Sequence, residues 1–263
     1  MRGIGQRQYG DPGYFNSGIQ GLLGYYRKTG MMGGAEGIRP KTTSWVASLR
    51  GSPELARLVG GVPVLCYDYT MRDSTDFLRR IDEDQELSAL LADAFEFDVR
   101  RKACRGSPRL ASGLPLEAIA GDFTGGRFYL CGVVGSPRPV LYASSEGDAG
   151  IIATDLREAL VLVVGFPYWR DSLGYSAGGD LSAMESATDL LCRDMLADRP
   201  AIEAEQSWVA ESLCVPLEAP SVLVARLRAA VKSAGPDFSF FDDTGEYGSL
   251  FGSFPPSRNR RWQ

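Results

Sequence analysis

The segment from residue 116 to residue 165 constrains the fold more than any other part of the chain. It contains four short apolar runs that are separated by brief turns rich in glycine, aspartate and serine. Two parallel strands need a crossover of a dozen or more residues between them, so connections this short predict an antiparallel meander. The four predicted strands are Leu116–Ala120, Arg127–Cys131, Val140–Ser144 and Gly150–Ala153.

A helix is expected directly after the fourth run. Thr154 is the predicted N-cap, and Asp155 lies where the helix dipole favours negative charge. Apolar residues then recur at helical spacing, and Gly165 and Pro167 end the pattern. This segment therefore predicts an amphipathic helix packed on the meander.

Helical patterns flank the meander on both sides. Residues 73–101 predict two helices with a break at the acidic run 82–84, the second helix continuing to Val99. Three more helices are expected after Asp180, the first capped by Ser182 and the third by Ser221. Near the start of the folded part, the patterns predict a helix that begins at Ser52 and covers Leu55 and Leu58, followed by a strand over Val62–Tyr69. Near the end of the chain, they predict a short strand around Phe238 and Phe240.

The chain divides into three parts by composition. Residues 1–43 hold 11 of the 31 glycines, and six Lys and Arg against two Asp and Glu give this arm a charge of +4. A glycine-rich segment without apolar periodicity is typical of a disordered or weakly docked arm. Residues 44–235 are predicted to form the folded domain. Residues 236–263 are predicted to form a strand and turn, followed from Gly248 by a mobile tail.

Composition excludes several kinds of site. The chain has no histidine, which removes Ser-His-Asp and Cys-His catalysis and all histidine-based metal sites. Its net charge is −5, which disfavours nucleic acid and anionic membranes and suits a basic protein partner. No apolar run is long enough to be a signal peptide or a membrane span, so we expect a cytoplasmic protein. The cysteines are odd in number and form no C-x-x-C pair, so we expect reduced, mostly buried thiols. The alternative is that Cys104, which lies in a basic run, is a reactive thiol. The five cysteines are Cys66, Cys104, Cys131, Cys192 and Cys214.

Neither a cofactor nor a metal ion is predicted. The run 121–126 resembles a phosphate-binding loop only in its glycines, because a strand follows it where a helix would be needed. Two acidic groups do not match a calcium loop and are interpreted as surface acids: Asp68, Asp73 and Asp76, and Asp237, Asp242 and Asp243. Asp122 and Glu146 stay open as a carboxylate pair for acid–base chemistry.

Several of these motifs together resemble the SUKH superfamily, which comprises bacterial immunity proteins related to a fungal cell-wall synthesis regulator. The similarity spans about residues 44–235, is most specific over 114–172, and is closest to large actinobacterial SUKH-like proteins. It implies an α+β fold, in which a mainly antiparallel, curved β-meander sheet is flanked by helices. The helical patterns after Asp180 extend beyond the compact core of that family and add a helical C-terminal part. The motifs are Ile119–Asp122, Phe128–Leu130, Pro139–Tyr142, Ser144–Gly147, Ala153–Leu160 and Pro167–Asp171.

The resemblance also implies a role. Immunity proteins of this superfamily bind a toxin and block it by occlusion, without catalysis. Acidic side chains would steer a basic toxin and a tryptophan would anchor it, so the predicted contact residues are Glu146, Asp148, Trp169 and Asp171. The alternatives are a regulatory or scaffold protein and a carboxylate-dependent enzyme. The partner and the oligomeric state stay open.

Overall fold

The computed structural model describes residues 58–59, 62–63, 73–103 and 106–252. Predictions for the arm 1–43, for the helix from Ser52 up to residue 57, for Asp68 and for Cys66 and Cys104 fall outside these residues. Leu58 was predicted to be helical, but Leu58–Val59 forms strand β1, which pairs antiparallel with β2, Val62–Pro63. The predicted strand over Val62–Tyr69 is therefore described only at its first two residues.

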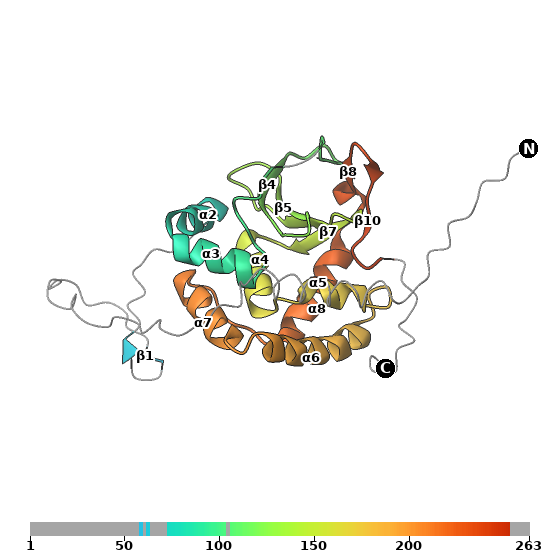
Figure 1. The fold of residues 1–263 in the computed structure, drawn as a ribbon. Coiled ribbons are helices and arrows are strands. Elements are labelled where there is room, and N and C mark those ends of the chain that lie inside the picture. Colours follow the sequence, from blue (N-terminus) through green and yellow to red (C-terminus); the bar gives the residue numbers. More distant parts are fainter. Residues whose placement is uncertain (1–57, 60–61, 64–72, 104–105, 253–263) are drawn as a thin grey trace, which may run out of the picture. The chain divides into compact units, whose positions relative to one another are not determined.

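The predicted meander is confirmed. Strands β4 (Leu116–Gly121), β5 (Arg127–Cys131), β6 (Val140–Ala143) and β7 (Asp148–Ala153) pair antiparallel in sequence order. Figure 1 shows β4, β5 and β7 in one sheet. A fifth strand, β10 (Gly248–Ser249), joins β7 in parallel. The α+β fold class is also confirmed: helices pack on a mainly antiparallel sheet, and the C-terminal part is mostly helical.

Both faces of the meander are covered, which explains why its strands are almost continuously apolar. One face carries Phe128, Leu130 and Tyr142 into the main helical core. The other face carries Tyr129 and Leu141 into a second cluster. A small antiparallel sheet contributes to that second cluster through Leu110 and Phe240, and its strands are β3 (Arg109–Leu110), β8 (Phe240–Asp242) and β9 (Gly245–Glu246).

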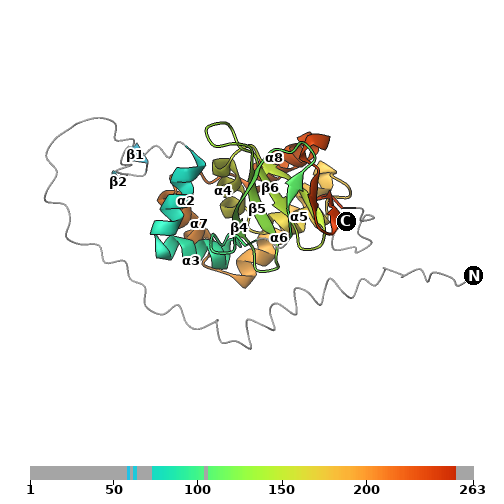
Figure 2. The ribbon, with the colours of Figure 1, turned by 90° about the horizontal axis from the view of Figure 1, so that it is seen from above.

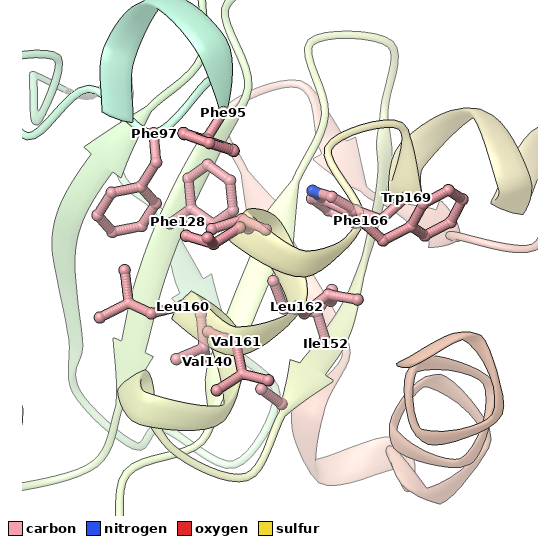
Figure 3. Close-up of a cluster of buried hydrophobic side chains, with 14 of the residues drawn as sticks. Phe95, Phe97, Phe128, Val140, Ile152, Leu160, Val161, Leu162, Phe166 and Trp169 are labelled. Carbon is pink, nitrogen blue, oxygen red and sulfur yellow. The ribbon is translucent and has the colours of Figure 1, made fainter. Parts of the chain in front are cut away.

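Helix α4 lies at the centre of the main core. Eight of its ten residues are buried, and it packs against β7 and three other helices, so it is not the amphipathic helix that was expected. Figure 2 shows it among α2, α7 and the sheet, and Figure 3 shows its residues beside Phe97 and Phe128. The helices are α2 (Ser74–Glu83), α3 (Gln85–Ala94), α4 (Leu156–Gly165), α5 (Trp169–Gly174), α6 (Leu181–Asp198), α7 (Ile202–Ser212) and α8 (Pro220–Ser233), with a 3₁₀ turn at Pro236–Phe238.

The helices begin at different residues from those predicted. Asp155, not Thr154, caps α4: its carboxylate accepts the Glu158 N–H at 2.8 Å, while Thr154 donates to the Glu158 carboxylate. Asp180, not Ser182, caps α6, and α8 begins at a proline, before the predicted cap Ser221. A carboxylate or a proline at the first position starts a helix as readily as a hydroxyl does, so the earliest competent residue sets the boundary.

The second predicted helix ends earlier than Val99. It stops at Ala94, and Glu96 then adopts a left-handed backbone conformation with φ of 53°. Asp98 and Gly121 exchange two backbone hydrogen bonds of 3.0 Å, which attach this segment to the edge of β4. The turn redirects the chain so that Phe97 and Val99 enter the core.

The tail predicted to be mobile from Gly248 is ordered as far as residue 252. Strand β10 carries the chain along β7, and Leu250 and Phe251 are each only 8% exposed within the main core. Local sequence did not indicate this, because the pairing partner lies about a hundred residues earlier. Residues 253–263 fall outside the described part.

Candidate functional site

The Asp122 carboxylate is the centre of a buried polar network. It lies in the β4–β5 turn with its side chain fully buried and accepts five hydrogen bonds. One oxygen accepts from the Thr124 hydroxyl at 2.7 Å and from the N–H groups of Gly125 and Gly126, both at 2.9 Å. The other accepts from the Tyr142 hydroxyl and the Arg170 guanidinium, both at 2.6 Å. These bonds saturate the carboxylate.

Arg170 connects three parts of the fold. From α5, one end of its guanidinium meets Asp122 and the other forms an ion pair with Glu96, just after α3. The guanidinium also lies 5.9 Å from the centre of the Tyr142 ring. A planar guanidinium can hold two carboxylates at once, which a lysine cannot do in the same geometry. Glu96, whose backbone is left-handed, is therefore one of the two carboxylates that Arg170 joins.

The electrostatics keep this network in one protonation state. Burial raises the pKa of the Tyr142 hydroxyl, and the Asp122 charge raises it further, so the hydroxyl remains a donor. Burial lowers the pKa of Arg170, whereas the Asp171 charge raises it. An arginine remains protonated in proteins, so neither group exchanges a proton near neutral pH.

Trp169 is not at the surface, and its prediction as a contact residue is therefore wrong. Its side chain is 1% exposed, with ring centres 5.1 Å from Tyr142 and 6.2 Å from Phe128. Figure 3 shows it in the buried cluster with Phe166. Helix α5 packs on the sheet so that the large ring fills the core, where its burial is favourable.

Glu146 and Asp148 lie together at the β6–β7 turn. Glu146 is exposed, and Asp148 is partly buried at the first residue of β7, opposite Gly248. Burial raises the pKa of Asp148, and the Glu146 charge adds to the effect. The Ser144 hydroxyl accepts the N–H groups of both residues and fixes the turn.

Asp171 is exposed on α5, and its charge acts on the same tyrosine, Tyr168, as the charges of two acids on α6. Burial raises the pKa of Tyr168 to about 12, with further contributions from Asp198, Asp171 and Asp194. The acids on this side therefore come from α5 and α6, whereas the other two predicted contacts lie at the sheet turn. This grouping could not be predicted from the sequence, because Asp194 and Asp198 lie 23 and 27 residues after Asp171.

The Asp122 and Glu146 pair does not offer two accessible carboxylates. Both act on Tyr142 electrostatically, but Asp122 is fully buried and saturated while Glu146 faces solvent. A substrate atom or water cannot reach the Asp122 oxygens without displacing their donors. This geometry disfavours acid–base work by the pair.

The other acidic groups have local structural partners. Asp73 caps α2, Asp242 accepts from Thr244 and Tyr247, and Asp243 accepts the Ser107 N–H. Within the described ranges, no cluster of three or more His, Cys, Asp and Glu residues is arranged to hold a metal ion.

A groove on the helical layer was not predicted from the sequence. It has a volume of about 350 Å³ and lies between α6, α7 and the connection from α7 to α8. Met195 and Ile202 are buried at its base, and Leu196 and Leu217 line it although they are 44% and 46% exposed. The feature of the sequence that could have indicated this groove is Leu196. It follows Met195, the last residue of the buried stripe of α6, by one position and therefore lies at the edge of that stripe.

The described cysteines differ in access. Cys131 is buried between the meander and the small sheet, Cys192 is partly buried and lines the groove, and Cys214 is exposed. All three are free thiols. Burial raises the pKa of Cys131 to about 12 and that of Cys192 to about 11. Cys214 departs from the expectation of buried thiols.

No protein-family model, curated protein or solved structure matches this chain. The resemblance to the SUKH superfamily accordingly stays a prediction from its motifs. A separate observation concerns membranes: in the part of the chain that the structure describes, no helix combines the length and the apolar character needed to span a bilayer.

Proposed function

We propose that this chain is a non-catalytic protein-binding module for a basic partner, and specifically a cytoplasmic immunity protein that occludes a cognate toxin. The observation that carries the proposal is the charge of the helical segment 181–218. It holds eight Asp and Glu against two Lys and Arg, a net charge of −6. The rest of the chain is therefore close to neutral, since the total is −5.

The contrast between interior and surface supports this role. The buried Asp122 and the partly buried Arg170 are engaged with each other and with Tyr142. The exposed acids of α6 and α7 include Glu185, Asp189 and Glu203. Acids on a surface attract a basic protein over a Debye length of about 8 Å and accelerate its association. The toxin-neutralising role rests on the motif resemblance described above.

Coexpression with the products of the adjacent genes tests the proposal. We expect one of them to be a toxin that forms a complex with this chain, and growth to be restored. Affinity should fall as the salt concentration rises, because the attraction is screened. A stable complex without any growth rescue would favour a regulatory or scaffold role, and the absence of any complex would refute the proposal.

A matched pair of variants locates the attraction. The triple variant Glu185→Gln, Asp189→Asn and Glu203→Gln should slow association severalfold. The control variant Glu83→Gln, Glu86→Gln and Glu246→Gln removes the same charge from other exposed positions and should bind nearly as well as the native chain. Equal slowing by both variants would show that net charge alone matters.

A further inference from the structure

We infer that the groove between α6, α7 and the α7–α8 connection is the docking site for a basic, amphipathic segment of a partner protein. This inference rests on the proposed function and adds where the partner binds and by what chemistry. Three features carry it: exposed apolar side chains, the size of the groove, and the charge around it.

The apolar contribution comes from side chains of two different elements that line the groove. Leu196 belongs to α6 and Leu217 to the connection before α8, and both line the same hollow while remaining nearly half exposed. Below them, Met195 and Ile202 are buried and continuous with the main core. Exposed leucines over a buried apolar base are typical of grooves that accept the apolar face of a helix.

The size of the groove suits anchoring side chains. Its volume is about 350 Å³, at the lower end of the range of ~300–1,000 Å³ for pockets that enclose a small molecule. It is also open to solvent along its rim, where Leu196 and Leu217 lie. A segment of a larger partner can insert a few apolar residues here while its remaining side chains contact the rim.

The charge around the groove selects a cationic segment. Glu203 lines the groove and is exposed, and within the described residues no ion pair engages its carboxylate. Glu218 lines the other side and pairs with the exposed Arg226. The lining cation, Arg193, donates to the backbone carbonyl of Asp189. Lysine or arginine residues beside the apolar anchors would therefore face Glu203, a lining carboxylate that no ion pair engages among the described residues.

The same charge argues against two other occupants. A second copy of this chain would bring another segment of net charge −6 against the first. An anionic membrane surface would be repelled in the same way. Both contacts place like charges opposite each other without compensation, whereas a basic segment relieves this repulsion.

A defined peptide provides the test. The probe is a synthetic helix of Leu and Lys about four turns long, or ~15 residues, with all leucines on one face. A matched peptide carries Glu at every Lys position. The readout is the rate at which iodoacetamide modifies Cys192 in the full chain at mildly alkaline pH, resolved from the other cysteines by mass spectrometry. Cys192 lines the groove, and the exposed Cys214 outside it is the internal reference.

We expect the Leu/Lys peptide to slow modification of Cys192 and not of Cys214, and the Leu/Glu peptide to have no effect. Leu196→Asn and Leu217→Asn should each weaken the peptide roughly tenfold, because they remove an apolar anchor. The control Val134→Asn replaces a side chain that is 74% exposed in the β5–β6 turn, outside the groove, and should leave binding unchanged.

Two binding results would overturn the inference, and so would one result on the oligomeric state. One is that the Leu/Lys peptide does not slow the modification of Cys192, or that it slows this modification equally in the Leu196→Asn and Val134→Asn variants. The other is a toxin complex whose affinity is indifferent to Leu196→Asn and Leu217→Asn. The second result would leave the proposed function intact and place its surface elsewhere, for example at Glu146 and Asp148. Oligomerisation that is lost in Leu196→Asn would assign the groove to a second copy.

Discussion

Arg170 shows how much of the fold depends on a single side chain. It holds a carboxylate of the β4–β5 turn and a carboxylate at the end of α3, and it lies next to the buried Trp169. Without it, Asp122 would remain fully buried with an uncompensated charge. Breaking a buried pair from one side is costly because the remaining ion keeps its desolvation penalty.

We therefore expect Arg170→Met to lower the free energy of unfolding by about 3–5 kcal/mol. Urea denaturation of the full chain measures this. The matched control is Arg226→Met, which removes an exposed arginine from its pair with Glu218 and should cost less than about 1 kcal/mol. Similar losses in both variants would contradict the structural role of Arg170. Adding Asp122→Asn to Arg170→Met should recover part of the loss.

The pKa of Asp148 gives a prediction for pH. Burial and then Glu146 raise this pKa, so the folded state favours the protonated acid. The stability that this group contributes is present below its unfolded pKa and is lost as the pH rises through its folded pKa. Asp148→Asn should accordingly be neutral or slightly stabilising at pH 7, and should lose that advantage in acid.

An NMR titration of the side-chain carboxyl carbons measures the pKa of Asp148 directly. Glu146→Gln removes the neighbouring charge and should lower the pKa of Asp148 towards its ordinary value. Asp171→Asn is the control, because Asp171 acts on Tyr168 and Tyr175 instead. A pKa of Asp148 that does not change in Glu146→Gln would leave burial as its sole cause.

At the scale of elements, short strands gain their stability from what covers them. Strand β10 has two residues, yet it brings Leu250 and Phe251 into the main core. Leu250 also lies against Gly150, where an added Cβ would be 3.2 Å from its side chain. The segment 248–251 is therefore part of the folded domain.

Phe251→Ala should lower the free energy of unfolding by about 3 kcal/mol, because it removes a buried ring and leaves a cavity. Thermal and urea denaturation measure the change. Phe123→Ala is the control: this ring is 38% exposed in the β4–β5 turn and should matter much less. A negligible effect of Phe251→Ala would indicate that the tail does not pack on the domain in solution.

At the scale of the whole molecule, the meander separates two apolar clusters. Cys131 lies in the cluster under the small sheet, 1% exposed, and burial raises its pKa to about 12. A reagent can reach this thiol only after a large part of the fold opens. Its reactivity therefore reports on the cooperative opening of the domain.

At pH 8 we expect a thiol reagent to modify Cys214 first, Cys192 much more slowly and Cys131 only at the rate of global opening. Peptide mapping over time measures the order. Urea below the unfolding midpoint should accelerate modification of Cys131 far more than that of Cys214. Rapid modification of Cys131 in the native protein would show that the small sheet opens locally.

Several features of the fold could be predicted from local pattern. Short apolar runs and short connections identified β4 to β7 as a meander, and the acidic break at residues 82–84 separated α2 from α3. The helix boundaries were less certain because neighbouring residues compete as caps, as Asp155 does with Thr154. The end of α3 depended on a backbone pairing with β4, which no local pattern contains.

The candidate site depended still more on the tertiary structure. Glu146 and Asp148 lie at the β6–β7 turn and Asp171 lies on helix α5, whereas Trp169 is buried. An aromatic residue beside a turn can face either way, and only packing decides which. Asp122 and Arg170 are 48 residues apart, and their pairing follows from packing of α5 on the sheet.

By itself, the sequence determined the meander, the central helix, the absence of histidine chemistry and the excess of acidic residues. All of these follow from residue types and short-range spacing. Only the tertiary structure decided which charges are buried and paired, where Leu250 and Phe251 pack, and that Leu196 and Leu217 line one groove. Those outcomes depend on contacts between distant segments, whose free energy is gained only when the whole domain has folded.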